Sequence, residues 1–141
     1  MGLMEIFNRV FGNYKNDNLK AEELHFEKVG EMLNETTFWK IVDLSVENST
    51  NQDQQEEFLI EEIAKLSPEE MIGFRLRTDV FLYETYNSET WCAGYIMNGG
   101  CSDDGFEYFR NWIISRGKDA YYKAKENPDS LISEFVQGEE Y

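Results

Sequence analysis

Basic residues are scarce in this sequence. Its 13 Lys and Arg are outnumbered by 28 Asp and Glu, which gives a formal net charge of -15. Nucleic acids and anionic membrane surfaces are bound mainly through Lys and Arg, so this charge argues against both nucleic acid and a membrane as partners. A basic protein would be attracted instead, although a large net charge also simply keeps a protein in solution.

Cysteine, proline and long apolar runs are scarce as well. Two cysteines, Cys92 and Cys101, are too few for a disulfide framework. Met1 is not followed by the basic segment, apolar stretch and cleavage site of a secretory signal, and no apolar run reaches the length of a membrane span. We therefore expect a cytoplasmic protein. With only 2 Pro and no low-complexity run, a break into several domains is not expected.

Apolar residues, by contrast, are plentiful, because 41% of the chain is hydrophobic and 15% is aromatic. A chain of 141 residues with this content can bury one sizeable core. The spacing of the apolar residues predicts an all-α protein, with a single compact helical domain over residues 20–141.

Residues 1–19 are expected to form an amphipathic N-terminal arm and a polar linker. One helical face of the arm carries Leu3, Phe7, Val10 and Phe11. A single Arg is a poor anchor for anionic lipid, so we expect the arm to dock on protein. One hypothesis is that it holds the chain in an oligomer.

Capping residues predict where several helices begin. Cap-type residues precede a helix over residues 38–44, and capping-box spacing marks three further helix starts. The cap-type residues are Asn34, Thr36 and Thr37, and the box pairs are Asp53 with Glu56, Ser67 with Glu70, and Asp104 with Glu107. Pro68 supports the second box, since proline suits the first helical position.

Glycines and turn signals predict the remaining boundaries. An exposed helix is expected over residues 20–33. Ser88 can cap a helix that ends at Gly99 and Gly100, with a β-hairpin turn at this glycine pair as the alternative. A further helix is expected over residues 118–125. The last short helix, over residues 131–136, is expected to precede an acidic tail.

Aromatic residues at helical spacing are expected to lie in the core more often than in a binding groove. The set consists of Trp91, Tyr95, Tyr108 and Trp112. The helix that starts near Asp104 is expected to turn Phe106, Phe109, Trp112 and Ile113 inward and to end at Gly117.

A set of residues between Phe38 and Leu131 matches a known pattern. The set consists of Phe38, Trp39, Ile41, residues 66–70, Trp91, Ala93, residues 98–106, 108–110 and 112–114, Gly117 and residues 127–131. In this set, above all in the 98–106 segment, the chain resembles an uncharacterised and largely bacterial family, the domain-of-unknown-function family 4240, over residues 38–131. Cys92 and Gly94 stand where small residues such as Ala are expected. The resemblance implies a helical domain without an assigned activity.

Cys101 is the sharpest candidate for chemistry. It lies between a glycine pair and a helix start, where the helix dipole can lower the pKa of a thiol. A buried structural thiol is the ordinary alternative. A cysteine nucleophile usually needs a base, but the only histidine, His25, lies outside the family-like region. No catalytic residue is therefore predicted.

Three carboxylates near Cys101 could in principle hold a hard cation. Asp103, Asp104 and Glu107 do not have the spacing of a calcium loop, however. Asp at a helix start also satisfies amide groups, and Glu107 can pair with Arg110 one turn later. No metal and no cofactor is predicted.

An acidic patch is expected between two of the helix starts. It consists of Glu56, Glu57, Glu61, Glu62, Glu69 and Glu70, against the single Lys65. A solvated helix face is the usual explanation, but an acidic face can also steer a protein onto a basic partner.

These observations lead to two hypotheses of different classes. The first is a non-enzymatic protein-binding module, for example an immunity-type protein that neutralises a basic toxin or nuclease. Its binding surface would combine the acidic patch with the exposed part of residues 98–107, including Asn98 and Ser102. The alternative is a small enzyme or ligand-binding domain that uses a constellation of Cys101, Asp103, Asp104 and Arg110.

Overall fold

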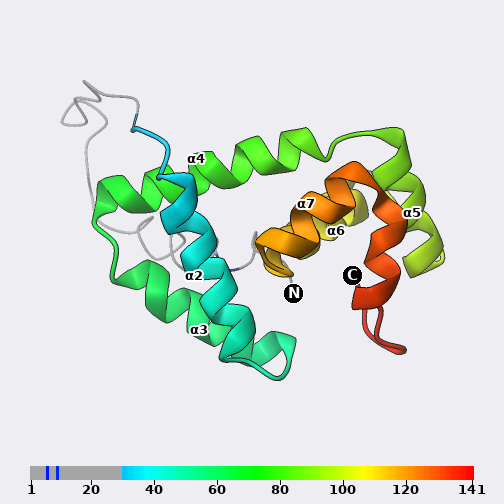
Figure 1. Ribbon diagram of the computed structural model, residues 1–141, viewed down its shortest axis with the longest axis horizontal. Helices are drawn as coiled ribbons and strands as arrows, with labels where there is room; N and C mark the ends of the chain where they lie inside the picture. Colours follow the sequence, from blue (N-terminus) through cyan, green and yellow to red (C-terminus); the bar gives the residue numbers. More distant parts are fainter. Residues whose placement is uncertain (1–5, 7–8, 10–29) are drawn as a thin grey trace.

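The computed structural model describes Ile6, Arg9 and residues 30–141, and the continuous stretch consists of helices and connecting loops (Figure 1). The helices are α2 (Glu35–Glu47), α3 (Gln52–Ala64), α4 (Pro68–Glu84), α5 (Ser88–Asn98), α6 (Asp103–Ser115), α7 (Lys118–Glu126) and the 3-10 helix η3 (Pro128–Glu134). No strand occurs in this stretch, which confirms the all-α prediction. Apart from Ile6 and Arg9, the predicted arm lies outside the described residues, as does most of the predicted 20–33 helix, and residues 30–34 are not helical.

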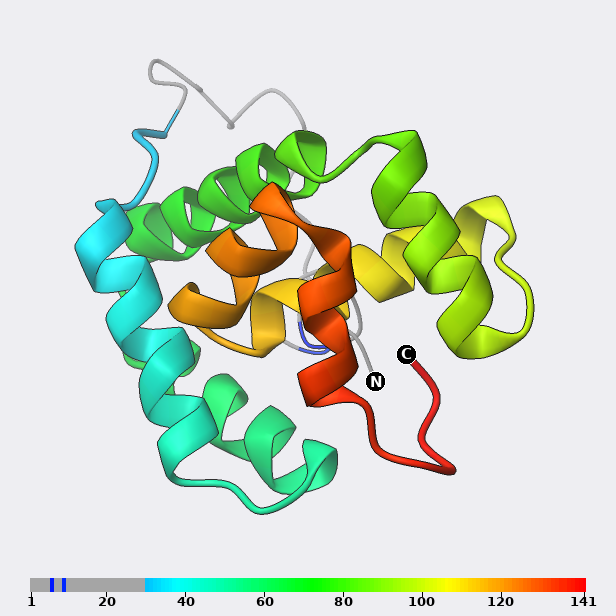
Figure 2. The ribbon, with the colours of Figure 1, turned by 45° about the vertical axis from the view of Figure 1, so that its right-hand side comes forward.

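Helix α6 is the centre of the domain. It contacts α2, α4, α5 and α7, and it buries Phe106, Phe109, Arg110, Asn111, Trp112, Ile113 and Ile114. Figures 1 and 2 show α2 and α3 as a pair at one end of the molecule and α5 at the other end, with α6 and α7 between them. The four aromatic and aliphatic residues predicted to face inward from α6 are all buried.

Aromatic rings fill the space between α2, α4 and α7. The ring of Phe38 lies 4.6 Å from that of Phe74, and the ring of Trp39 stacks 4.8 Å from that of Phe81. Tyr121 of α7 closes the cluster, with its ring 5.2 Å from that of Trp39. Aromatic pairs at such distances add to the stability that burial of their area already provides.

The capping residues are confirmed for two helices, although α2 begins three residues before its predicted start at residue 38 and ends at Glu47. Asn34 caps α2, since its side chain accepts from the backbone N–H of Thr36 and Thr37. Ser67 and Glu70 form the predicted capping box in front of Pro68. In both cases the capping residue has a short polar side chain that reaches the first unpaired amides.

The other two capping boxes are wrong by two residues. Helix α3 is capped by Asn51, and α6 is capped by Ser102, which accepts from the N–H of Gly105 at 3.1 Å. Asp53 and Asp104 therefore lie inside the first turns, where their charges face the helix N-terminus. Asn51 and Ser102, two positions earlier, have extended backbone and a short polar side chain, and they therefore serve as the caps.

Helix α5 stops at Gly99, whose φ of 68° is left-handed, so the prediction of a helix rather than a hairpin is confirmed. Its predicted cap at Ser88 is wrong by one residue, because Asn87 caps it. It packs through small residues, because its buried positions are Thr90 and Gly94. A Cβ at Gly94 would lie only 2.8 Å from the ring of Phe109. The larger Tyr95 and Ile96 lie on the exposed side of α5. The core prediction is therefore wrong for Tyr95, which is exposed.

Two further sequence predictions are corrected. Tyr108 is exposed, although Trp112 is buried as expected and Trp91 is half-buried. The last helix begins at Pro128 and is a 3-10 helix, so its predicted start at residue 131 is late.

The expected acidic tail folds back onto the domain, because the buried ring of Tyr141 packs 4.5 Å from that of Trp112. Among the helices described, none is long and apolar enough to cross a membrane.

Candidate functional site

The 98–106 segment connects α5 to α6 and is held by Trp91. The indole of Trp91 stacks 4.4 Å from the ring of Phe106, and its Nε1 donates to the carbonyl oxygen of Cys101 at 3.1 Å. Gly100 donates its N–H to the carbonyl of Tyr95 at 2.9 Å, which completes the helix stop. These contacts hold the 98–106 segment as a rigid connection between α5 and α6.

Cys101 does not have the environment of an activated thiol. Burial raises the pKa of its thiol, which is opposite to the shift that nucleophilic catalysis needs. The thiol is half-buried, whereas Asp103 and Asp104 are exposed in the first turn of α6. Within the described part of the chain, no group of three or more His, Cys, Asp or Glu side chains could hold a metal ion.

Arg110 lies in the interior of the protein, whereas Asp103 and Asp104 are exposed. Arg110 is only 8% exposed, and its guanidinium lies 4.9 Å from the ring centre of Tyr86 and 4.6 Å from that of Phe106. A guanidinium N–H donates to the carbonyl oxygen of Leu82 at 2.7 Å. The four residues of the predicted constellation therefore differ in burial, because Arg110 is buried, Cys101 is half-buried and the two aspartates are exposed.

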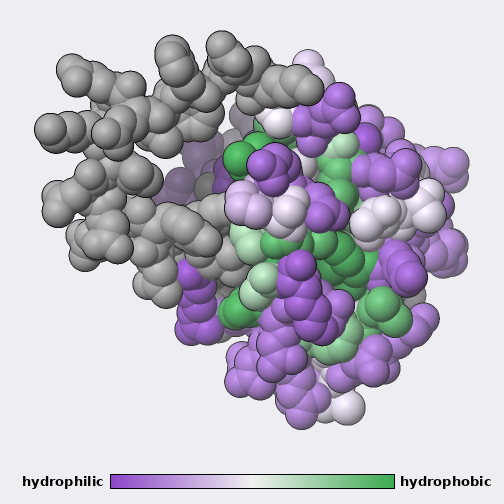
Figure 3. Space-filling model, turned by 90° about the vertical axis from the view of Figure 1, so that its left-hand side faces the viewer, coloured by the Kyte–Doolittle hydropathy of each residue, from purple (hydrophilic) through white to green (hydrophobic). Residues whose placement is uncertain are grey.

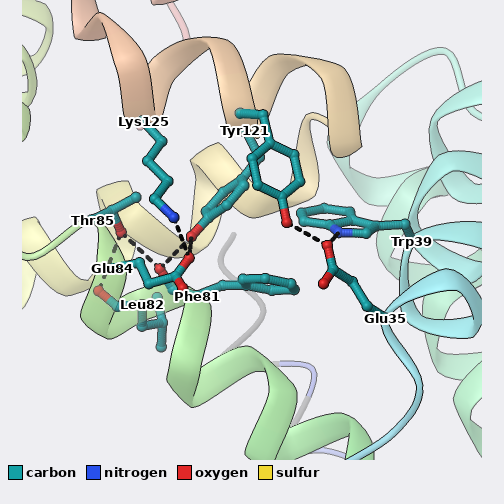
Figure 4. A network of polar contacts seen from close by, with 9 residues as sticks. Glu35, Trp39, Phe81, Leu82, Glu84, Thr85, Tyr121 and Lys125 are labelled. Carbon is teal, nitrogen blue, oxygen red and sulfur yellow. Dashed lines mark hydrogen bonds and ion pairs between the residues drawn. The ribbon is translucent and has the colours of Figure 1, made fainter.

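The carbonyl oxygens at the end of α4 explain why Arg110 is buried. The last carbonyls of a helix have no partner within it. The carbonyl oxygen of Leu82 accepts from Arg110, and the carbonyl oxygen of Phe81 accepts from the hydroxyl of Tyr121 at 2.9 Å. Thr85 donates to the same two carbonyls (Figure 4). Side chains from α6 and α7 thus cap α4.

Two carboxylates extend this network across the domain (Figure 4). Glu84 accepts from the hydroxyl of Tyr121 at 3.1 Å and pairs with Lys125 at 2.8 Å. Glu35, at the start of α2, accepts from the hydroxyl of Tyr122 and from the indole N–H of Trp39. The network joins α2, α4 and α7 and stabilises the packing of these helices.

The tyrosines of this network predict a loss of stability at alkaline pH. Burial, with the hydrogen bond to Glu35, raises the pKa of Tyr122 from 10.0 to about 12, and burial raises that of Tyr121 further. The unfolded chain loses these protons first, so the free energy of unfolding should fall as pH rises from about 10 to about 12. The midpoints of urea unfolding, determined across this pH range, would measure the loss of stability. The Tyr122→Phe variant should show a shallower fall, and an identical pH profile would contradict this account.

The six residues of the predicted acidic patch have different environments. Glu56 is only 4% exposed and pairs with Arg9 at 2.7 Å, so it is not part of an exposed acidic surface. Glu62 pairs with Lys65, and Glu70 serves the capping box. The other three, Glu57, Glu61 and Glu69, are exposed. The face at this end of the molecule mixes hydrophilic with apolar side chains (Figure 3).

The acidic patch and the 98–107 residues do not form one surface. The patch lies on α3 and the start of α4, whereas residues 98–107 follow α5 at the other end of the domain (Figures 1 and 2). The side chain of Ser102 is used in its cap. That of Asn98 binds the backbone of Tyr141, donating to its carbonyl at 2.7 Å and accepting from its N–H at 3.1 Å.

An open apolar groove between α5 and η3 is the feature that sequence reasoning missed. Its volume is about 580 Å³, and it is lined by Ala93, Ile96, Met97, Pro128, Asp129, Ile132 and Phe135. Two isoleucines dominate it, because Ile96 is 73% and Ile132 is 80% exposed. Exposed apolar side chains that gather in one place mark binding surfaces. We call this feature the α5–η3 groove.

A second hollow, of about 560 Å³, lies beside the start of α7. It is lined by Asp43, Val46, Glu47, Arg116, Gly117, Lys118, Asp119 and Tyr122. Its helix N-terminus is already used, since the N–H of Lys118 donates to the carboxylate of Asp43 at 2.8 Å. This hollow is therefore a weaker candidate for a ligand site than the α5–η3 groove.

Comparison with known proteins places the chain in a family. No curated protein and no solved structure matches it. The model of one family, described as "Protein of unknown function (DUF4240)", matches residues 33–141. The match includes the 98–106 segment, Arg110 and both walls of the α5–η3 groove. The chain belongs to the DUF4240 family.

Proposed function

We propose that this protein is a non-enzymatic module that binds a basic protein. The observation that carries the proposal is the α5–η3 groove, in which two isoleucines are largely exposed on a chain of net charge -15. An apolar patch supplies affinity through burial, and the surrounding negative charge steers a positively charged partner toward it.

The residues considered for catalysis favour binding over chemistry. The pKa of Cys101 is raised, and the guanidinium of Arg110 is occupied by a carbonyl and two rings. No observation favours the enzyme alternative over the binding module. An immunity-type role agrees with the negative charge of this chain, because a nuclease toxin carries basic residues that bind the nucleic-acid polyanion.

Affinity capture from the source cell tests the proposal. We expect the tagged chain to retain one basic protein at low ionic strength. That protein should be released between about 0.1 M and about 1 M salt, as the screening length falls from about 10 Å to about 3 Å. Recovery of no protein, or of an acidic one, would contradict the proposal. A toxin encoded beside this chain would support the immunity-type role.

A further inference from the structure

We propose that the α5–η3 groove receives an amphipathic helix of the partner, with apolar side chains in the groove and Lys or Arg along its rim. This inference rests on the proposed function, because the occupant belongs to the basic protein. It adds the site and the chemistry of the contact. In this proposal the acidic patch on α3 and α4 does not contact the bound helix and only attracts the basic partner from a distance.

The two walls of the groove present regular stripes of side chains. On α5, Ala93 and Met97 are separated by four residues, and Ile96 lies beside them. On η3, Asp129 and Ile132 follow at the three-residue spacing that aligns side chains on a 3-10 helix, and Phe135 comes three residues later. The small Ala93 leaves room between the larger side chains.

The dimensions and lining favour a helix over a small polar ligand. Helix α5 has 11 residues and so extends for about 16 Å, which is about three turns of a helix laid alongside it. Asp129 is the only charged or polar side chain in the lining, so a small polar ligand would find few side-chain partners for its hydrogen bonds. An apolar helix face laid in a groove is a recurring mode of recognition, and Met97 can adapt its shape to it.

The charge around the groove selects a basic occupant. Residues 88–101 contain Glu89, and residues 126–141 contain Glu126, Asp129, Glu134, Glu139 and Glu140, with no Lys or Arg in either segment. The last two of the three lysines of α7 are already paired, Lys123 with Asp119 at 2.6 Å and Lys125 with Glu84 at 2.8 Å. A second copy of this chain would bring its own negative rim and be repelled.

The η3 wall is held in place before any partner arrives. Asn98 at the end of α5 binds the backbone of Tyr141, as described above. The ring of Tyr141 lies 5.8 Å from that of Phe135, and its hydroxyl donates to the carbonyl of Val136 at 2.6 Å. A preformed wall lowers the ordering cost of binding.

A synthetic peptide provides the probe. It is a fluorescein-labelled, helix-forming peptide of about 18 residues, roughly five turns, with leucines along one face and lysines along the other. Its controls are a scrambled peptide of the same composition and one with glutamate in place of lysine. Fluorescence anisotropy should show that the amphipathic basic peptide binds about tenfold or more tightly than either control. Equal binding of the scrambled peptide would overturn the proposal.

The position of binding is read from isoleucine methyl groups by NMR. The methyl signals of Ile96 and Ile132 should shift on addition of the peptide, whereas that of Ile72, on α4, should not. Shifts at Ile72 alone would overturn the proposal. So would concentration-dependent shifts of Ile96 and Ile132 without peptide, because they would identify a second copy as the occupant.

Matched variants separate the apolar from the charged contribution. Ile96→Ser with Ile132→Ser should weaken peptide binding about tenfold or more, whereas Ile72→Ser, also at an exposed isoleucine, should not. Glu89→Gln with Glu126→Gln should weaken peptide binding more than Glu57→Gln with Glu61→Gln, which removes the same charge elsewhere.

If the cellular partner is basic but binds the double serine variant unchanged, the groove assignment fails and the proposed function stands. If no basic partner exists, the proposed function itself fails.

Discussion

The Trp39→Ala variant is expected to lower the free energy of unfolding by about 3–5 kcal/mol. Trp39 is buried at the point where α2, α4 and α7 meet, and its ring contacts those of Phe38, Phe81 and Tyr121 at centroid distances of 5.1, 4.8 and 5.2 Å. Alanine would leave a cavity between three helices that cannot close without moving all of them. The indole N–H that donates to Glu35 would also be lost.

Urea unfolding followed by circular dichroism would measure this loss. Tyr83→Ala is the matched control, because Tyr83 is an aromatic residue on α4 that is 82% exposed, and its removal should change stability by less than about 0.5 kcal/mol. Trp39→Phe, which keeps part of the ring contact, should fall between the two. A loss below about 1 kcal/mol for Trp39→Ala would contradict the central place of this cluster.

The helices could be predicted from the sequence because their signals are local. Asn34, Ser67 and Gly99 act through side chains or backbone angles that involve only residues of the adjacent helical turn. The same locality explains the errors of two residues at Asp53 and Asp104. Several residues near a helix start can cap it, and their backbone conformation decides which one does.

Burial could not be predicted where tertiary packing reverses the local pattern. Glu56 was expected on an acidic surface, but it is buried and paired with Arg9, which lies far away in the sequence. On α5 the buried positions are the small residues Thr90 and Gly94, whereas Ile96 is exposed although it is apolar. Neither arrangement has a signature in the local spacing of residues.

The α5–η3 groove could not be predicted for a related reason. Its walls are about thirty positions apart in the sequence, and they meet only because α6 and α7 return the chain to α5. The sequence did carry one cue, the spacing of Asp129, Ile132 and Phe135, which follows a three-residue period. A period of three is not a helix signal unless a 3-10 helix is expected, and such helices are rarely this long.

The Arg110→Ala variant is expected to lower the free energy of unfolding by about 2–4 kcal/mol. It removes the donor to the carbonyl of Leu82 and the group that fills the space between Tyr86 and Phe106. Arg110→Met keeps most of the volume and removes only the charge and the donor. Because Thr85 also donates to Leu82, the methionine variant should lose about half as much or less.

The Arg110→Met variant also distinguishes the protein-binding module from the alternative of a ligand-binding domain. If Arg110 only caps α4, the folded methionine variant should bind the amphipathic basic peptide as tightly as the unchanged protein, since Arg110 does not line the α5–η3 groove. Urea unfolding and anisotropy on the same samples would give both quantities. If Arg110→Met left stability unchanged but abolished binding of the peptide or of the cellular partner, Arg110 would contact a ligand, and its assignment to the end of α4 would be wrong.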